Sequence, residues 1–335
     1  MKNKITLKEL AKLLNVSVST VSKALNDSPE ISAKTVERVK ELAKLHNYRP
    51  NPVAVNLKSS KSSTIGVIIP NISNSFFAKV LSGIEAEAQQ AGLQVITYIS
   101  NEKLDREKQI CDMLTTGYVD GVLIAVAEET QRKQEFDHLY NLVDYGIPIV
   151  LYDRINFDIP ADRIGIDDVG TFTDVTKRLL AKGIKKVGIA TSIHHMGVGK
   201  LRIDGYKAAL PENTTFYIAN SARPEVLKEK TEVMLVDDKV EAVICTDYES
   251  TMQVYRTAFE HKINIPKDLK VIGFIGKELA QFLAPSISYI DQFPEEMGKG
   301  AMQLLEARLN NYNKDKAGSE RILKTNLVDL ESTQF

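Results

Sequence analysis

Three short segments at the start of the chain carry apolar side chains at helical spacing. Thr6 can cap the first segment, and Glu9 follows three residues later, as a capping box requires. Ser17 can cap the second segment, and residues 32–45 repeat the pattern in a third amphipathic helix. The turn between the first two helices contains Asn15, a residue type that tolerates the left-handed conformation. This pattern predicts a helix-turn-helix whose second helix is small enough to enter a DNA major groove.

Beyond residue 63, short apolar runs alternate with segments of helical periodicity, which predicts parallel, doubly wound sheets. This part of the chain is too long for one core of that kind, so we expect two lobes. The expected strands are 64–69, 94–99, 121–125, 148–152, 186–190, 242–245 and 271–275, with a last strand over 321–330. The expected helices are 76–90, 105–116, 133–145, 169–181, 224–235 and 250–261.

Charge is distributed unevenly between these two regions. Residues 1–61 carry twelve basic and five acidic side chains, a net charge of +7. The whole chain has a net charge of −1, so the remainder carries −8. A basic head on an acidic body is expected when only the head meets phosphate. The charge pattern therefore favours DNA binding over an ordinary helical hairpin at the start of an enzyme.

Two motifs mark the head and the segment that follows it. Residues 16–22 read Val-Ser-x-x-Thr-Val-Ser, and residues 47–57 read Asn-Tyr-x-Pro-Asn-x-x-Ala-x-x-Leu. With these motifs, and along essentially its whole length, the chain resembles the LacI/GalR family of bacterial transcription regulators. The resemblance implies an α/β chain with an all-α helix-turn-helix head and a two-lobed, doubly wound core like that of periplasmic sugar-binding proteins.

The resemblance also implies a division into domains, with three crossings between the lobes. We expect a DNA-binding domain at 1–50, a hinge helix and linker at 51–63, and an effector-binding core at 64–335. The crossings are expected near 157–162, 288–293 and 317–321. Lobe one would then comprise about 64–157 plus 293–317, and lobe two about 162–288 plus 321–335.

DNA contacts follow from the resemblance for the head and the hinge. Val18, Ser19 and Lys23 match positions that face base edges; lysine can contact guanine O6 and N7, and valine suits a thymine methyl group. In the family, the leucine at the position of Leu57 inserts as a wedge into the minor groove. Leu57 could instead be a linker residue that packs on the next domain. The expected DNA-binding residues are Thr6, Ser17, Val18, Ser19, Thr20, Ser22, Lys23, Asn51, Ala54 and Leu57.

A small ligand is expected between the lobes, where loops gather at the carboxyl ends of strands. Phe76 or Phe77 can stack on a sugar ring, and at least one of the two should pack in the core. Arg202 matches the arginine with which the family holds a polar effector. For each such position, the alternative is a surface or hinge-stabilising polar residue. The expected effector-binding residues are Phe76, Phe77, Asp153, Arg154, Arg202, Asp247 and Gln292.

One motif departs from the family pattern and bears on the effector. The frequent Gly-Phe-Asp-Asp stands here as Gly-Phe-Ile-Gly at residues 273–276, with both carboxylates absent. In many members the aspartate meets sugar hydroxyls or braces residues that do. Because Arg202 is kept while a carboxylate is lost, the sequence favours an acidic effector, such as a sugar acid or a sugar phosphate.

Catalytic and cofactor motifs are missing from the sequence. It has neither a glycine-rich phosphate loop nor a Gly-x-Ser-x-Gly elbow, and the adjacent His194 and His195 lack companion metal ligands. We therefore expect no enzyme activity, no cofactor and no metal. Cys111 and Cys245 are expected to be reduced core thiols. Without an apolar leader or a membrane-spanning run, the protein is expected to be cytoplasmic, with no membrane partner.

Together these features predict a transcription regulator, a repressor, whose affinity for its operator is gated by a small carbohydrate-type effector. Paired heads would read a near-palindromic double-stranded operator, so we expect a homodimer. The chain has no heptad tail of the kind that forms tetramers. Two alternatives stay open: a periplasmic-type sugar-binding protein without a regulatory role, and a catabolite regulator that depends on a corepressor protein.

Overall fold

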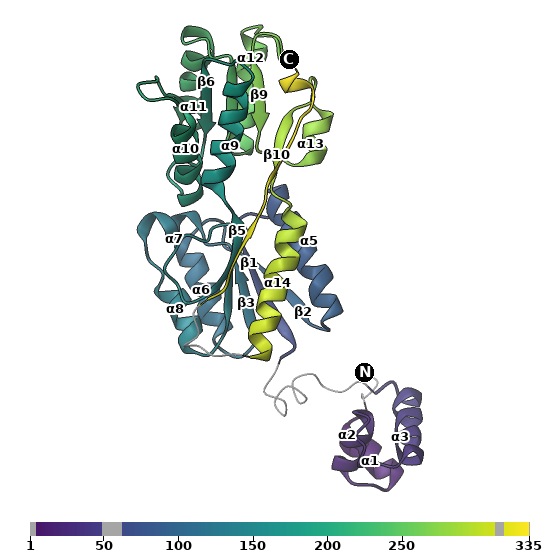
Figure 1. The fold of residues 1–335 in the computed structure, drawn as a ribbon. Helices are drawn as coiled ribbons and strands as arrows, with labels where there is room; N and C mark the ends of the chain where they lie inside the picture. Colours follow the sequence, from purple (N-terminus) through teal and green to yellow (C-terminus); the bar gives the residue numbers. More distant parts are fainter. Residues whose placement is uncertain (1–4, 49–61, 312–317, 335) are drawn as a thin grey trace. The chain divides into compact units, whose positions relative to one another are not determined.

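The computed structural model describes residues 5–48, 62–311 and 318–334. Their contacts divide the chain into two units, Met1–Ser62 and Ser63–Phe335. The first unit is a three-helix head (Figure 1). Its helices are α1 (Leu7–Leu14), α2 (Val18–Leu25) and α3 (Ala33–Leu45).

Local capping explains where the helices of the head begin. The Thr6 N–H donates to Glu9 Oε2 at 2.7 Å, and the Glu9 N–H donates to Thr6 Oγ1 at 3.3 Å, which completes the predicted capping box. Ser17 caps α2 by accepting from the Thr20 N–H at 3.0 Å. Asn15 ends α1 in the left-handed conformation, with φ of 53°. The predicted helix-turn-helix is confirmed.

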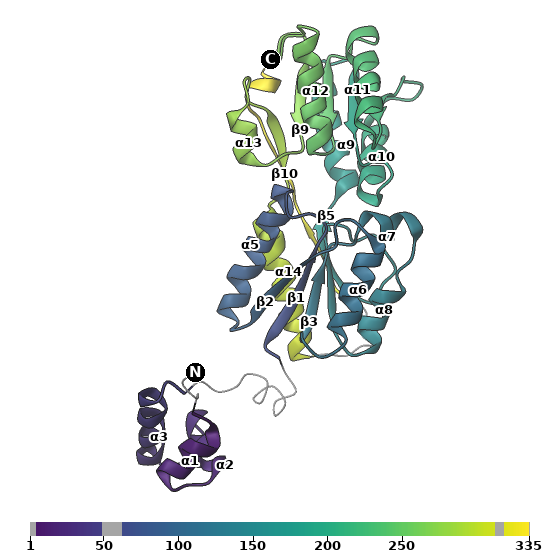
Figure 2. The ribbon, with the colours of Figure 1, turned by 180° about the vertical axis from the view of Figure 1, so that it is seen from behind.

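The second unit has two lobes, each built on one sheet (Figures 1 and 2). The strands of lobe one are β1 (Thr64–Ile69), β2 (Gln94–Ile99), β3 (Gly121–Ile124), β4 (Ile149–Tyr152), β5 (Asp162–Ile166) and β11 (Glu320–Leu323). The strands of lobe two are β6 (Val187–Thr191), β7 (Tyr217–Asn220), β8 (Ala242–Cys245), β9 (Lys270–Gly273), β10 (Ser288–Asp291) and β12 (Asn326–Val328).

Strand order confirms the doubly wound fold that the sequence predicts. The sheet of lobe one has the order β11-β5-β4-β3-β1-β2, and its described pairs are all parallel. The sheet of lobe two has the order β12-β10-β9-β8-β6-β7, in which β12 runs antiparallel to β10. Most of the predicted apolar runs form central strands, whereas the run 94–99 forms the edge strand β2.

Helices cover both faces of each sheet (Figures 1 and 2). Those of lobe one are α5 (Ser75–Gln90), α6 (Leu104–Leu114), α7 (Glu128–Lys133), α8 (Asp137–Asp144) and α14 (Pro294–Asn310). Those of lobe two are α9 (Asp168–Ala181), α10 (Gly197–Ala209), α11 (Pro224–Glu232), α12 (Tyr248–Glu260) and α13 (Lys277–Phe282). A π-helix (Val233–Asp237) continues α11, and a 3-10 turn (Glu331–Thr333) follows β12. No helix within the described ranges is long and apolar enough to cross a membrane.

The chain crosses between the lobes after β5, β10 and β11. The positions predicted near 157–162 and 317–321 are wrong, because β5 and β11 extend the sheet of lobe one. Asp162 is only 3% exposed, because its carboxylate accepts from Arg308 on α14 at 2.7 and 2.8 Å. The second crossing falls between β10 and α14.

Two glycines let α5 and α14 pack closely on one face of lobe one. A Cβ on Gly83 would lie 2.1 Å from the carbonyl oxygen of Glu295, and a Cβ on Gly298 would lie 2.0 Å from that of Val80. Neither helix backbone can hold a side chain at these points. Since α14 begins immediately after the second crossing, this contact fixes the helix that leads the chain back into lobe one.

The close approach gives a direct test. Gly83→Ala forces the two helices apart, and overpacking of this kind typically costs about 1–3 kcal/mol of unfolding free energy. We expect a lower thermal midpoint for the core, measured by circular dichroism. Ser82→Ala, on the exposed side of the same helix, should leave the midpoint within about 0.5 kcal/mol of the parent. Equal midpoints for the two variants would contradict the packing.

Candidate functional site

Helix α2 presents one face to the core of the head and the opposite face outward. Val21 and Ala24 are fully buried against the neighbouring helices. Val18 is 40% exposed, and the side chain of Lys23 is 42% exposed. The predicted base-reading side chains therefore lie on the outer face, as a reading helix requires.

Hydroxyl groups at the start of the head helices serve as caps. Ser17 Oγ lies 2.8 Å from Ser19 Oγ and 2.8 Å from Thr20 Oγ1. Thr6 is engaged in the capping box of α1. Ser22, by contrast, has its backbone carbonyl bound by the Asn26 side chain at 2.9 Å. The predicted hinge contacts Asn51, Ala54 and Leu57 lie outside the described residues.

In lobe one, a buried arginine lies two residues after the end of β4. Arg154 is 6% exposed, and its Nη1 and Nη2 each donate to Glu102 at 2.8 Å. Nη1 also donates to the Val126 carbonyl at 2.7 Å. The guanidinium lies over the ring of Phe77, 5.5 Å from its centroid. These contacts fix Arg154 in place before any ligand arrives.

In lobe two, a second buried arginine lies within α10 rather than in the loop where the sequence placed it. Arg202 is 4% exposed; its Nε donates to Asp168 at 2.7 Å, and its Nη1 donates to the Thr246 carbonyl at 2.6 Å. The guanidinium is 4.0 Å from the centroid of the Phe274 ring. The hydrogen bonds that the described residues give Arg202 use Nε and Nη1, which leaves Nη2 for a ligand.

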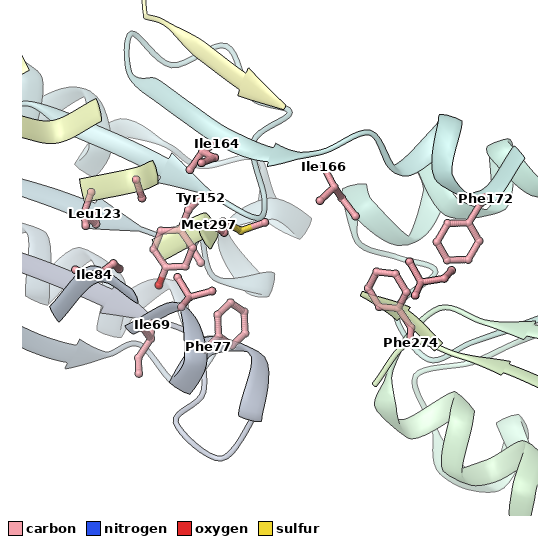
Figure 3. Packing of buried hydrophobic residues seen from close by; sticks show 14 of the residues in the cluster. Ile69, Phe77, Ile84, Leu123, Tyr152, Ile164, Ile166, Phe172, Phe274 and Met297 are labelled. Carbon is pink, nitrogen blue, oxygen red and sulfur yellow. The ribbon is translucent and has the colours of Figure 1, made fainter. Parts of the chain in front are cut away.

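Each lobe thus has the same arrangement at the edge that faces the other lobe. An arginine lies over a phenylalanine ring and is held there by a carboxylate. Figure 3 shows Phe77 at the edge of lobe one that faces lobe two, and Phe274 at the opposing edge. Phe77 is 3% exposed and packs edge-on against Tyr152, with 6.5 Å between ring centroids, so it belongs to the core. Of the two neighbouring residues Phe76 and Phe77, Phe76 is only half-buried, so part of its ring remains accessible to a ligand.

The carboxyl group of Asp153 lies close enough to interact electrostatically with arginines of both lobes. Asp153 has a φ of 63°, a left-handed conformation that Asp and Asn tolerate better than most residues. Burial raises the pKa of this carboxyl to about 6, while the positive charges of Arg154 and Arg202 oppose the rise. Asp153 Oδ2 is 3.7 Å from Arg154 Nε, too far for a hydrogen bond. The carboxylate is therefore available to accept from a ligand.

Asp247 is engaged by its own lobe, which supports the stabilising alternative for this position. Its Oδ1 accepts from the Ser250 N–H and from Ser192 Oγ, both at 2.8 Å. Its Oδ2 accepts from the Ser192 N–H at 2.9 Å and from Thr246 Oγ1 at 2.7 Å. With four donors already in place, Asp247 caps α12 and fixes the loop before α10.

Gln131, which the sequence did not single out, brings an unsatisfied acceptor to the same region. Its Nε2 donates to the Val126 carbonyl at 2.9 Å, the same oxygen that Arg154 binds. This bond fixes the amide orientation, so the buried Oε1, which has no partner among the described residues, is an acceptor. Gln292 has a buried Oε1 in the same situation. The sequence analysis did not single out Gln131, because the helix predicted at 133–145 begins only at the last residue of α7.

Contacts at two edges join the lobes. Lys79 on α5 forms an ion pair with Glu278 on α13. At the other edge, His195 Nε2 lies 3.0 Å from Glu128 Oε1 on α7, within ion-pair range but without hydrogen-bond geometry. Nearby His195 lowers the pKa of Glu128.

No group of three or more His, Cys, Asp or Glu side chains in the described ranges is arranged to hold a metal ion. Cys111 and Cys245 are buried free thiols, as the sequence predicts.

The raised pKa of Asp153 has a consequence for stability. Because the folded protein holds the proton more tightly than the unfolded chain, ionisation costs folding free energy as pH rises from about 4 to about 6. Asp153→Asn removes this cost and suits the left-handed backbone. We expect the thermal midpoint of the variant, relative to the parent, to be higher at about pH 7 than at about pH 5. The exposed Asp174→Asn serves as the control, and an equal pH dependence for the two variants would refute the assignment.

Comparison with known proteins gives matches for both units. The profile described as "Bacterial regulatory proteins, lacI family" matches residues 6–51, and that of the "Periplasmic binding protein-like domain" matches residues 176–333. The transcriptional regulator RegA of Clostridium saccharobutylicum is 28% identical over 335 residues, 98% of this chain and 99% of the relative.

Two solved structures share the fold over nearly the whole chain. The lac repressor dimer bound to operator and the anti-inducer ONPF has a TM-score of 0.83 at 21% identity, with 99% of both chains covered. The complex of the regulator CelR with cellobiose has a TM-score of 0.70 at 22% identity, with 98% of this chain and 99% of that chain covered.

These matches settle the family and the class of protein. The head match disfavours a periplasmic-type sugar-binding protein without a regulatory role. The relatives named above are regulators, not enzymes. The expected fold class, a helix-turn-helix head with a periplasmic-binding-protein-like core, is confirmed. The chain belongs to the LacI/GalR family of bacterial transcription regulators and is a sequence-specific DNA-binding protein.

Proposed function

We propose that the chain is a homodimeric repressor whose affinity for a near-palindromic operator is controlled by a neutral, hydroxyl-rich sugar or sugar derivative bound between the lobes. The observation that carries the proposal is the set of buried polar groups at the facing edges of the lobes. These groups include two arginines that are already neutralised and acceptors that are not yet satisfied. As a DNA-binding regulator, the protein would act in the cytoplasm.

Charge at the facing edges argues against the acidic effector that the sequence favoured. Glu102 neutralises Arg154, and Asp168 neutralises Arg202. Asp153 then adds a negative charge without an arginine at hydrogen-bond distance. An anionic ligand would have to displace a carboxylate that is already paired with an arginine or approach Asp153, and an uncompensated buried charge is strongly unfavourable. A neutral ligand meets neither obstacle.

The unsatisfied acceptors indicate which groups the ligand carries. Asp153 and the Oε1 atoms of Gln131 and Gln292 accept hydrogen bonds and need donors. A buried acceptor without a partner costs about 1–3 kcal/mol, which a ligand hydroxyl would relieve. Arg202 Nη2 can donate in return. The hydroxyl groups of a sugar can both donate and accept hydrogen bonds, and the regulator CelR is solved in complex with a neutral sugar, cellobiose.

Gating follows from contacts to both lobes. A ligand that binds Asp153 of lobe one and Arg202 of lobe two has a higher affinity for the arrangement in which the two approach, and so shifts the protein toward it. The start of lobe one is fixed by a hydrogen bond, since the Ser63 N–H donates to Asp120 at 2.8 Å.

Two-fold symmetry of the operator would require a two-fold protein, as in the operator-bound lac repressor dimer.

Lys23 provides the test on the DNA side. Lys23→Ala should weaken binding to the preferred operator by roughly 1–3 kcal/mol, if the lysine contacts a guanine through O6 and N7. The operator is obtained by selecting bound genomic fragments, and affinity is measured by fluorescence anisotropy. Selection repeated with the variant should show a relaxed preference at one position in each half-site. An unchanged preference would remove Lys23 from base reading.

Gln131 provides the test on the effector side. With the selected operator, neutral sugars and their acid and phosphate derivatives are screened for compounds that change affinity. Gln131→Met removes the free acceptor and keeps the volume, so the effective concentration of the active sugar should rise about three- to tenfold. Operator affinity without ligand should be unchanged. Gln90→Met, on the exposed end of α5, is the control.

Other results would redirect the proposal. If only acids or phosphates change operator affinity, the neutral class is wrong. If no fragment is enriched until a second protein is added, the corepressor-dependent alternative holds. A tetrameric mass by light scattering would overturn the dimer.

A further inference from the structure

An acidic residue of the head is paired with the lysine of the reading helix. Lys23, in the last turn of α2, forms an ion pair through Nζ with Glu30 Oε2. Glu30 lies in the connection between α2 and α3, and its side chain is 67% exposed. The pair therefore lies at the surface, beside the side chains that face DNA.

Short-range bonds hold Glu30 at this place. The Ser28 N–H donates to the Lys23 carbonyl at 3.0 Å, and the Ile31 N–H donates to the Ser28 carbonyl at 3.1 Å. Ile31 packs against the apolar core of the head. With both neighbours of the segment tied to the fold, the Glu30 carboxylate stays within reach of Lys23 when the ammonium moves toward DNA.

The pair is too weak to serve stability. Exposed ion pairs shift a folding equilibrium by at most about fivefold, and many have no measurable effect. An acidic group on a DNA-facing surface also opposes the attraction to phosphate that gives most of the non-specific affinity. Its effect must therefore be sought in binding.

We propose that Glu30 is a specificity-determining residue that reserves Lys23 for base reading. A lysine free in solution forms a non-specific phosphate contact with DNA of any sequence, because the contact releases condensed counterions. Glu30 competes for the same ammonium group and so reduces the contribution of that contact to non-specific affinity. A guanine that binds the lysine through O6 and N7 favours its site by about five- to 150-fold, which is enough to displace the carboxylate.

The test compares variants of the full chain on a random-sequence DNA duplex. Glu30→Gln frees Lys23 and keeps the shape of the side chain. We expect non-specific affinity at low salt to rise about three- to tenfold, and the slope of log affinity against log salt to steepen by up to about 0.9. Affinity for the selected operator should rise less, so the ratio of specific to non-specific affinity should fall.

Two controls separate this role from a change in overall charge. Glu41→Gln removes one negative charge from an exposed position on α3 for which no ion pair is described among residues 5–48. It should change non-specific affinity less than Glu30→Gln does. In a Lys23→Ala background, Glu30→Gln should have little further effect, because the two residues act through one contact.

Each other outcome overturns the proposal. If Glu41→Gln has an equal effect, or if Glu30→Gln acts as strongly without Lys23, Glu30 contributes only through net charge. If Glu30→Gln weakens operator binding, the carboxylate itself contacts a base, such as the amino group of cytosine. Thermal melting of each variant shows that the head remains folded.

Discussion

A buried guanidinium is stable only where carboxylates and carbonyls satisfy it, and two such groups set the character of the facing edges of the lobes. Arg154 and Arg202 come from different lobes, yet each is held by a carboxylate and a backbone carbonyl above an aromatic ring. Removing one partner from a buried pair typically costs about 3–5 kcal/mol. The facing edges are therefore preorganised, and the ligand finds their charge already compensated.

Much of the fold could be predicted because apolar runs and caps are local signals. The central strands and the capped helices of the head lie where periodicity placed them. Strand β5 was missed, because what makes it a strand is distant in sequence. Asp162 opens β5 only because Arg308 satisfies it, 146 positions further along the chain. Helix α10 was missed because its glycine-rich start conceals the helical period.

The site could be predicted only in part, for the same reason. Position after a strand pointed to Asp153 and the family resemblance pointed to Arg202, and the structure brings both to the facing edges of the lobes. Position could not show that Asp247 is occupied by four donors of its own lobe. Nor could it show Gln131, whose free acceptor exists because a carbonyl fixes the other end of the amide. Partners, rather than residue types, decide which polar groups remain for a ligand.

The head and the core use paired charges in opposite ways. The pair of Lys23 and Glu30 is exposed, so water and phosphate can exchange with it at little cost, and selectivity arises from competition for the lysine. The pair of Arg202 and Asp168 is buried, so exchange would leave a charge without a partner. There the ligand is selected by the acceptors that remain, not by displacing the pair. A regulator that must leave most DNA quickly and hold its effector firmly needs both arrangements, one open to exchange and one closed to it.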